Sequence, residues 1–312
     1  MIRMLYLDNS ATTRVHEEVL QAMLPYLKEE YGNPSSKYYT LAENAKRAVE
    51  EARERVAALV GCEPDEVIFT SGSTEGNNMI IKGVAHYYRN NGNYIITSKV
   101  EHPSVLETCK FLELNGYKVI YLDVDRYGRI SVEELETKIK YEPPILVTLI
   151  WGNNELGSLN DIEKVSHICE TNNILFHTDA TQVVGKVKFN LSQLPGIRFL
   201  TFSGHKIHGP KGIGVAIIRR DKIGKRTRIT PLLHGGGQEF EYRSGTLAVH
   251  NIVGIGKAAD IAARDIDKNI KKLELLEAKC KELLIAKFGD QIVFNNDDKD
   301  KIPGLLNFIL KG

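Results

Sequence analysis

Residues 198–219 read RFLTFSGHKIHGPKGIGVAIIR: an apolar run, a turn rich in glycine, and a second apolar run. Runs of this kind predict buried strands over Arg198 to Ser203 and Gly214 to Arg219. Lys206 lies in the turn, directly after the first strand. A lysine held there loses water, which lowers its pKa and suits it to attack an aldehyde. Lys211 is the alternative, although its glycine neighbours favour an exposed turn, and an isolated lysine is usually a solvated surface residue.

The same alternation of strand and helix extends in both directions from this segment. Five further strands are expected over Glu66 to Thr70, Tyr94 to Ser98, Lys118 to Leu122, Ile145 to Ile150 and Ile174 to Thr178. Helical patterns separate them, for example over Ser131 to Tyr141 and Asp161 to Thr171, each beginning with a residue that can cap a helix. The sequence therefore predicts an α/β fold with a mainly parallel, seven-stranded sheet and helices on both faces.

Two more polar segments follow strands of this sheet. Residues 70–78, TSGSTEGNN, join a strand to a helix, where free N–H groups and the hydroxyls of Ser73 and Thr74 suit a phosphate. These hydroxyls could equally do no more than cap the helix. Asp179 follows the Ile174 to Thr178 strand, at the edge where open α/β sheets bind ligands. It too could be a simple cap.

Together the three segments indicate one cofactor. They place a phosphate cradle, a carboxylate and a lysine at the same edge of the sheet. Pyridoxal phosphate needs an anion site for its phosphate, a carboxylate for its ring nitrogen and an amine for its aldehyde. We therefore expect pyridoxal phosphate to bind between Asp179 and Lys206.

The chain is long enough for two domains, with 312 residues. We expect a large cofactor-binding domain over residues 1–258, with an N-terminal arm over 1–15. Residues 259–312 are expected to hold the rest of a long helix, Val249 to Phe288, and a truncated small domain with strands over Gln291 to Phe294 and Leu305 to Leu310. This small domain is expected to be incomplete, because the second strand is not followed by further strands that it could join.

Charge and cysteine usage restrict the class of protein. A net charge of +1 favours neither nucleic acid nor an anionic membrane as a partner. The four cysteines show no CxxC spacing, which argues against a metal site or a disulfide framework. The N-terminus lacks the apolar region of a signal peptide, and Ile145 to Trp151 is too short to span a membrane. We expect a soluble protein in the reducing cytoplasm.

Many motifs, in order along the chain, resemble one family. They are residues 5–13 (LYLDNSATT), 32–36 (GNPSS), 70–78, Glu101-His102, 153–157 (NNELG), 179–182 (DATQ), 203–214, 235–239 (GGGQE) and 243–246 (RSGT). The chain thus resembles the cysteine desulfurases, a class V aminotransferase group of fold-type I pyridoxal-phosphate enzymes. This resemblance implies removal of sulfur from L-cysteine, giving L-alanine and a persulfide for iron–sulfur cluster or tRNA thiolation pathways.

The resemblance also implies a set of site residues. They are Lys206 for the covalent link to the cofactor, Asp179 for its ring nitrogen, Gln182 and Asn154 beside its ring hydroxyl, and Ser73, Thr74, Ser203 and His205 for its phosphate. His102 would stack on the ring and assist proton transfer, which suits a flat group that titrates near neutrality; otherwise it caps a helix. Thr246 would reach the phosphate of a second subunit, which implies a homodimer.

Some features depart from the family pattern. Tyr38 stands where the family often has histidine, and Glu241 where glycine is usual. The resemblance also implies a later segment, with a cysteine that takes the sulfur and an arginine that binds the substrate carboxylate. The cysteines present, Cys62, Cys109, Cys169 and Cys280, are interpreted as packing residues, so we expect the thiol to come from elsewhere.

Alternatives to this activity stay open at this stage. A pyridoxal-phosphate lyase or aminotransferase could use the same scaffold without a cysteine, and a non-catalytic homologue could serve as an assembly partner. The expected partners of a desulfurase are L-cysteine, a second copy of the chain, and a sulfur-acceptor protein such as an iron–sulfur scaffold or a tRNA-thiolation enzyme.

Overall fold

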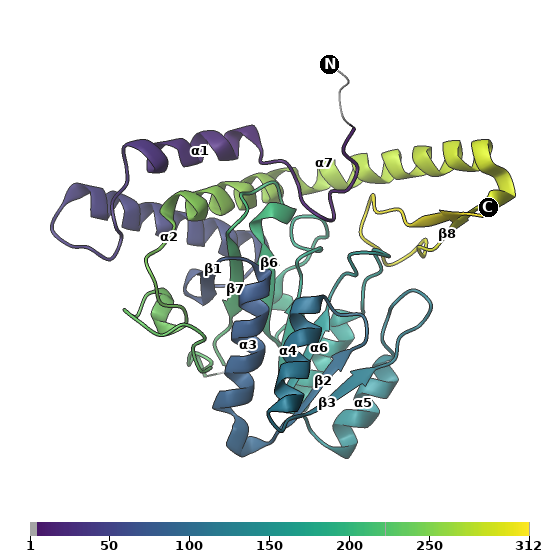
Figure 1. Cartoon of the computed structure of the whole chain (residues 1–312), viewed down its shortest axis with the longest axis horizontal. Coiled ribbons are helices and arrows are strands. Elements are labelled where there is room, and N and C mark those ends of the chain that lie inside the picture. The colour runs from purple at the N-terminus through teal and green to yellow at the C-terminus, as the bar shows by residue number, and fades with distance from the viewer. Residues whose placement is uncertain (1–4, 222, 312) are drawn as a thin grey trace.

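A computed structural model describes residues 5–221 and 223–311, and Figure 1 shows the path of the chain. The α-helices of the described residues are α1 (Glu17–Lys28), α2 (Thr40–Val60), α3 (Ser73–Tyr87), α4 (Pro103–Leu114), α5 (Val132–Tyr141), α6 (Ile162–Thr171) and α7 (Val249–Phe288). None of the helices in this part of the chain combines the length and the apolarity of a membrane span. Residues 1–4 of the expected N-terminal arm lie outside the described residues.

The main sheet contains the seven strands expected from the apolar runs. They are β1 (Val67–Thr70), β2 (Tyr94–Ser98), β3 (Lys118–Leu122), β4 (Leu146–Ile150), β5 (Leu175–Asp179), β6 (Ile197–Ser203) and β7 (Gly214–Ile218). Their order across the described sheet is β1-β7-β6-β5-β4-β2-β3. Only β7 runs antiparallel to its neighbours, so the prediction of a mainly parallel α/β sheet is confirmed. The carboxyl ends of β1, β5 and β6 consequently lie at one edge.

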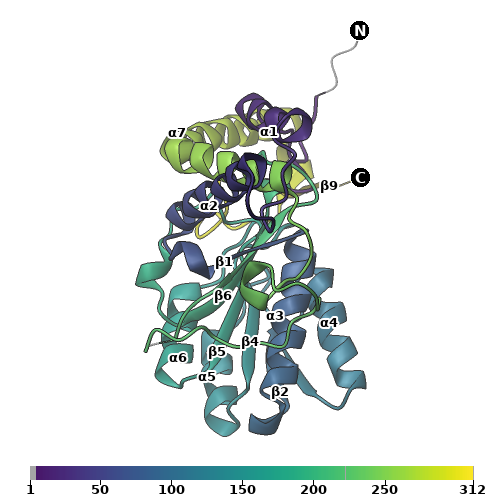
Figure 2. The ribbon, with the colours of Figure 1, turned by 90° about the vertical axis from the view of Figure 1, so that its left-hand side faces the viewer.

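Helices cover both faces of the sheet, as Figure 2 shows from the side. Helices α3 and α4 pack on one face, whereas α2, α5, α6 and the start of α7 pack on the other. Successive strand residues alternate between the two cores because strand side chains point to opposite faces: Val67 and Phe69 face one core, and Ile68 faces the other. The sheet is thus buried from both sides.

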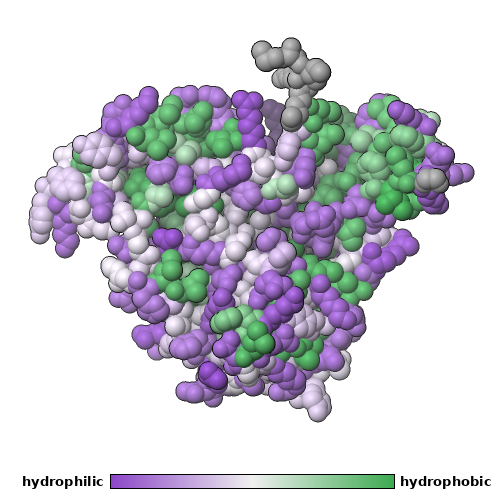
Figure 3. Space-filling model, viewed as in Figure 1, coloured by the Kyte–Doolittle hydropathy of each residue, from purple (hydrophilic) through white to green (hydrophobic). Residues whose placement is uncertain are grey.

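Helix α7 changes its surroundings along its length. It is buried as far as Ala262, where it packs against α1 and α2. Its second half extends toward the antiparallel pair β8 (Ile292–Phe294) and β9 (Phe308–Leu310), and apolar side chains are exposed there (Figure 3). Cys280 lies in this half and is exposed, so its interpretation as a packing residue is wrong. The helix passes residue 258 unbroken, and the division into two domains stays a prediction.

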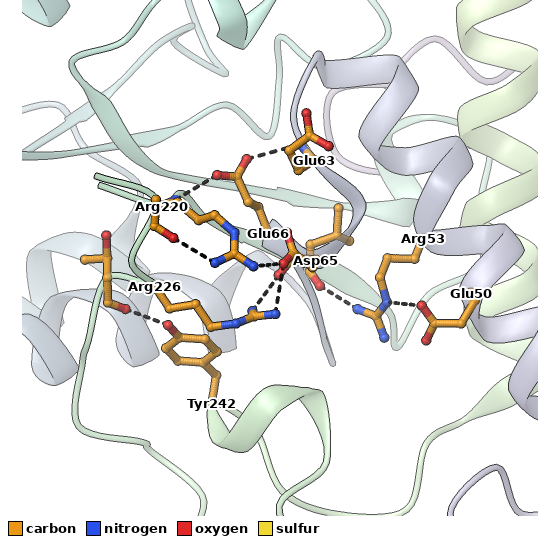
Figure 4. Close-up of polar contacts among 11 residues, drawn as sticks. Glu50, Arg53, Glu63, Asp65, Glu66, Arg220, Arg226 and Tyr242 are labelled. Carbon is orange, nitrogen blue, oxygen red and sulfur yellow. Dashed lines mark hydrogen bonds and ion pairs between the residues drawn. The ribbon is translucent and has the colours of Figure 1, made fainter. Parts of the chain in front are cut away.

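Ion pairs connect the segment after β7 to the short helix that precedes β1 (Figure 4). Asp65 belongs to the short helix η1 (Pro64–Glu66) and forms ion pairs with both Arg220 and Arg226. Tyr242 donates from its hydroxyl to the Thr227 carbonyl oxygen at 2.6 Å. The ion pairs therefore hold Arg220 and Arg226 against η1, and Tyr242, the residue before the motif at 243–246, is bonded to the same segment.

Candidate functional site

A cavity of about 670 Å³ opens at the carboxyl ends of β1, β5 and β6. Its wall contains most of the residues predicted for the site, namely Ser73, Thr74, His102, Asn154, Asp179, Gln182, Ser203, His205 and Lys206. Thr246 is exposed and does not belong to the wall in the described part of the chain. A larger hollow of about 860 Å³ lies beside α6, and its described lining includes none of these residues.

Lys206 ends the short helix η4 (Gly204–Lys206), which follows β6 directly. Its Nζ donates hydrogen bonds to the carbonyl oxygens of Ser10 and Ala11, the latter at 2.8 Å. Burial lowers the pKa of Lys206, against the opposing effect of Asp8 and Asp179. A lowered pKa increases the fraction of neutral amine at pH 7, which is the form that attacks an aldehyde.

Asp179 ends β5 and is only 3% exposed. Its carboxylate accepts hydrogen bonds from the side-chain amide of Asn77 at 2.8 Å and from the backbone N–H of Thr181 at 3.0 Å. Both donors are neutral. A buried carboxylate is stabilised by a positive partner, so Asp179 suits a protonated ring nitrogen in the cavity.

The expected phosphate cradle lies where α3 begins. The backbone N–H of Ser73 donates to Ser203 Oγ at 2.8 Å, and the two serine hydroxyl oxygens are 3.0 Å apart. These residues follow β1 and β6, so the sheet brings the two segments together. A Cβ atom on Gly214 would come within 2.5 Å of Gly72 Cα, which means that only glycine allows β7 to start so close to the cradle.

Positive charge surrounds His205, which also lines the cavity. The pKa of His205 is lowered to about 4, chiefly by burial and then by Lys206, Lys211 and Lys186. The three ammonium groups that disfavour an imidazolium favour a phosphate dianion at the same place. His205 is therefore neutral at pH 7 in the protein without cofactor, and a bound anion would reverse part of this effect.

A carboxylate, Glu75, forms part of the same wall and would repel a phosphate if it were unpaired. Arg243 neutralises it, with Nε 2.8 Å from Glu75 Oε1. The backbone N–H of Ser71 donates to the other carboxylate oxygen at 2.8 Å. Burial raises the pKa of Glu75, but Arg243 and Ser71 outweigh it and lower the pKa overall. The motif at 243–246 thus supports the cradle through this ion pair.

His102 caps a helix and also lines the cavity, so its place in the structure is compatible with both roles that the sequence left open. It is the N-cap of α4, and its Nδ1 accepts a hydrogen bond from the Ser104 backbone N–H at 3.1 Å. The ring also lines the cavity. Because Nδ1 is an acceptor, the neutral ring carries its proton on Nε2.

Gln182 and Asn154 complete the predicted set. Gln182 donates from Nε2 to the Ser10 carbonyl oxygen at 2.9 Å, and Lys186 donates to Gln182 Oε1 at 2.8 Å. Asn154 donates to Glu155 Oε1 at 2.7 Å. Sequence reasoning missed Lys186, although its place four residues after Gln182 was a usable signal.

The chain matches known proteins along nearly its whole length. The family model described as aminotransferase class-V matches residues 5–312. A cysteine desulfurase IscS from Dictyoglomus turgidum is 43% identical over 309 residues, which are 99% of this chain and 76% of that protein. The chain belongs to the cysteine desulfurase family. The human cysteine desulfurase is 41% identical, and the match covers 98% of this chain and 66% of the human protein.

Solved structures of the family confirm the fold-type I architecture. A NifS-like protein, 39% identical, superposes with a TM-score of 0.92 over 98% of this chain and 81% of that one. The cysteine desulfurase of Thermococcus onnurineus, solved in its apo form and 26% identical, gives a TM-score of 0.88 over 99% of this chain and 79% of its own. The shared part of the fold is thus almost the entire described chain.

Membership of the cysteine desulfurase family implies pyridoxal phosphate as the cofactor, and the cavity fits this molecule. A buried carboxylate with neutral partners, an amine with a lowered pKa and a cationic cradle meet in one space. These are the groups that its ring nitrogen, aldehyde and phosphate require. Asp179, Lys206 and the Ser73–Ser203 pair are the residues that would hold it.

Proposed function

We propose that this chain removes sulfur from L-cysteine, with Lys206 as the covalent attachment point of pyridoxal phosphate. The observation that carries the proposal is the meeting of Lys206, Asp179 and the cationic cradle in one cavity. A structural neighbour described as SspA in complex with cysteine is 39% identical, with a TM-score of 0.78 over 82% of this chain and 72% of that one. L-alanine and a persulfide are the expected products, since the sulfur passes to an acceptor thiolate.

Each residue of the cavity wall has a separate role in the proposed reaction. Bound pyridoxal phosphate supplies an electrophilic aldehyde and a ring that accepts electrons from bonds at the substrate α-carbon. Lys206 supplies the amine, and Asp179 keeps a proton on the ring nitrogen. His102 presents the nitrogen that exchanges a proton with the substrate, and Ser73, Thr74, Ser203 and His205 hold the phosphate. Gln182 and Asn154 would lie beside the ring hydroxyl.

The acceptor thiol does not come from this cavity. None of the four cysteines, which all lie in the described part of the chain, belongs to its wall. Cys109 and Cys169 are buried, which raises the pKa of each thiol to about 12 and disfavours the reactive thiolate. We infer that the thiol belongs to a further segment or to an acceptor protein, such as an iron–sulfur scaffold or a tRNA-thiolation enzyme.

A homodimer in the cytoplasm is the proposed setting. Thr246 is exposed and lies outside the cavity of its own chain, which supports a role at the phosphate of a second subunit. The unpaired state of all four thiols supports a reducing compartment. Loss of cofactor affinity in Thr246→Ala, with restoration in dimers mixed with a Lys206→Ala subunit, would test the shared site.

The covalent link tests the cofactor assignment. Borohydride reduction of the protein loaded with pyridoxal phosphate, followed by peptide mapping, should label Lys206. Lys206→Ala should lose the label and retain its fold, whereas the matched variant Lys211→Ala should keep it. Label on Lys211 would contradict the assignment. Product analysis with L-cysteine separates a desulfurase, which gives alanine, from a lyase or an aminotransferase on the same scaffold, which gives pyruvate or another keto acid.

A further inference from the structure

Asn77 of α3 links two parts of the cavity wall, Asp179 and the start of α4 that carries His102. It is fully buried, and its side-chain nitrogen lies 2.8 Å from both Asp179 Oδ2 and Ser104 Oγ. Its side-chain oxygen lies 2.5 Å from Thr201 Oγ1. An ionised carboxylate only accepts hydrogen bonds, so the NH₂ group must face Asp179. The orientation of the amide is thereby determined, and Thr201 must donate to its oxygen.

The direction of the next hydrogen bonds follows from this amide. Asn77 uses one amide hydrogen on Asp179 and the other on Ser104 Oγ. The Ser104 hydroxyl therefore keeps its single hydrogen for another acceptor, and His102 Nδ1 lies 2.8 Å away. Together with the Ser104 backbone N–H, this gives His102 Nδ1 two donors. Both donors favour the tautomer with its proton on Nε2 over the tautomer with its proton on Nδ1.

The chain of hydrogen bonds extends into the core on the other side of Asn77. Thr201 donates to Asn77, so it accepts from His177 Nε2, which lies 3.2 Å away. Burial lowers the pKa of His177 to about 4, so its ring is neutral and carries one proton, on Nε2. His177 Nδ1 then accepts from the Thr148 hydroxyl at 2.8 Å. Because these core side chains are fully buried, water cannot supply alternative partners.

We propose that Asn77 and Ser104 are positioning residues, which hold the His102 ring in its Nε2-protonated form and couple it to Asp179. The same amide that donates to the Asp179 carboxylate also determines that the Ser104 hydroxyl donates to the His102 imidazole. The inference rests on the proposed function for the meaning of His102, but the hydrogen bonds exist without cofactor or substrate. They can therefore be tested in the cofactor-free protein.

Asn77→Asp replaces the NH₂ group that donates to Ser104 by an oxygen that can accept, with little change in the shape of the side chain. Next to Asp179, the new carboxyl shares one proton with it. The oxygen that replaces the amide nitrogen also lies within hydrogen-bond distance of Ser104 Oγ and, unlike the NH₂ group, accepts a hydrogen bond from this hydroxyl. The Ser104 hydroxyl then no longer donates to His102. We expect the ratio of Nε2–H to Nδ1–H rings at His102 to fall about five-fold, the factor that corresponds to one net neutral hydrogen bond. The matched control is Asn78→Asp, one residue along the same helix, which should leave His102 unchanged.

Nuclear magnetic resonance of protein labelled with ¹⁵N-histidine measures this ratio from two-bond ¹H–¹⁵N correlations, and His102→Gln identifies the signals. Ser104→Ala should also lower the ratio about five-fold, and it decides the matter if Asn77→Asp does not fold. In the Ser104→Ala background, Asn77→Asp should have no further effect on His102. An unchanged ratio in folded variants, or an effect of Asn77→Asp that persists without the Ser104 hydroxyl, would overturn the proposal. Failure of Lys206 to bind the cofactor would contradict the proposed function and leave this result intact.

Discussion

Arg53 of α2 and Glu239 form a buried, two-pronged ion pair, with Nη2 2.8 Å from Oε1 and Nη1 3.1 Å from Oε2. Glu239 starts the short helix η5 (Glu239–Glu241), whose three residues all have positive φ angles of 49°, 57° and 72°. Residues other than glycine rarely adopt this conformation, which costs about 1–2 kcal/mol each. The ion pair therefore holds a strained turn that leads directly to Arg243 and the phosphate cradle.

Breaking this ion pair should cost much of the stability. Glu239→Gln leaves the buried Arg53 with only the half-exposed Glu50 as an ionic partner, which compensates its charge in part, so we expect a loss of about 3–5 kcal/mol in the free energy of unfolding. The matched control is Glu107→Gln, whose partner Lys110 is exposed, and there the loss should stay below about 1 kcal/mol. Urea unfolding at pH 7 compares the two variants. Equal losses would show that burial of the Arg53 pair adds nothing.

Glu241→Gly should stabilise the protein. Glu241 is exposed and has a φ of 72°, so glycine removes the strain of the left-handed conformation. The greater freedom of glycine in the unfolded chain opposes this effect in part. The free energy of unfolding is therefore expected to rise by about 0.5–1 kcal/mol overall. In the exposed helical position Glu107, the same change should destabilise by about 1 kcal/mol. Thermal unfolding of both variants checks the sign, and destabilisation by Glu241→Gly would contradict the account.

Glu101 should make the stability depend on pH. Its carboxyl is buried, which raises its pKa to about 8 despite a hydrogen bond from the Ser98 hydroxyl at 2.5 Å. Between about pH 4.5 and 8 the folded protein binds the proton and the unfolded chain does not, so stability falls as the pH rises through this window. Glu101→Gln should remove this pH dependence. Above pH 8 its free energy of unfolding should exceed that of the unchanged protein by on the order of a few kcal/mol. Unfolding of both proteins at pH 5, 7 and 8.5 measures the difference, and parallel pH profiles would contradict it.

The strands and the long helix could be predicted because their information is local. The apolar runs of β2 and β3 have the same bounds in the sequence and in the structure, and Val249–Phe288 is one helix as its spacing indicates. Of the nine residues that meet in the cavity, Ser73, Thr74, Asp179 and Lys206 were predicted from their places after strands of one sheet, and the other five from the family resemblance. Their individual roles stay predictions.

Properties that depend on contacts between distant segments could not be predicted. The exposure of Cys280 follows from the absence of described residues packed over that part of α7, whereas its position in the apolar stripe indicated burial. Glu101 is part of a family motif, yet its raised pKa arises from burial, which the motif does not predict. Asn77 lies in the cradle motif, but its link to Ser104 joins residues of two different helices.

His205 should titrate far below the ordinary histidine value in the cofactor-free protein. Burial and three lysines lower its pKa to about 4. Inorganic phosphate bound beside it would stabilise the imidazolium, so the midpoint should rise when phosphate is added. Lys211→Met should raise it as well, in the absence of phosphate, because one of the three positive charges is removed. Imidazole resonances followed against pH give the titration midpoints. A midpoint near 6.5 that does not change when phosphate is added would show that no anion binds beside His205.

Sulfide release by residues 1–312 alone should be slow. L-cysteine should still bind, with weakened affinity because no arginine in the described cavity wall contacts its carboxylate. Sulfur transfer also needs a thiolate within bonding distance of the substrate Sγ, and no cysteine lines this cavity. We expect at least about 100-fold faster release when a protein segment with a mobile cysteine is added, because a positioned thiol replaces a bimolecular encounter. Sulfide assays with and without that segment measure the factor, and replacing all four cysteines by alanine should leave both rates unchanged. If the chain alone releases sulfide rapidly and Cys280→Ala abolishes this release, the exposed Cys280 thiol is the acceptor. If rapid release survives all four replacements, the reaction is not desulfuration by transfer to a thiol of this chain.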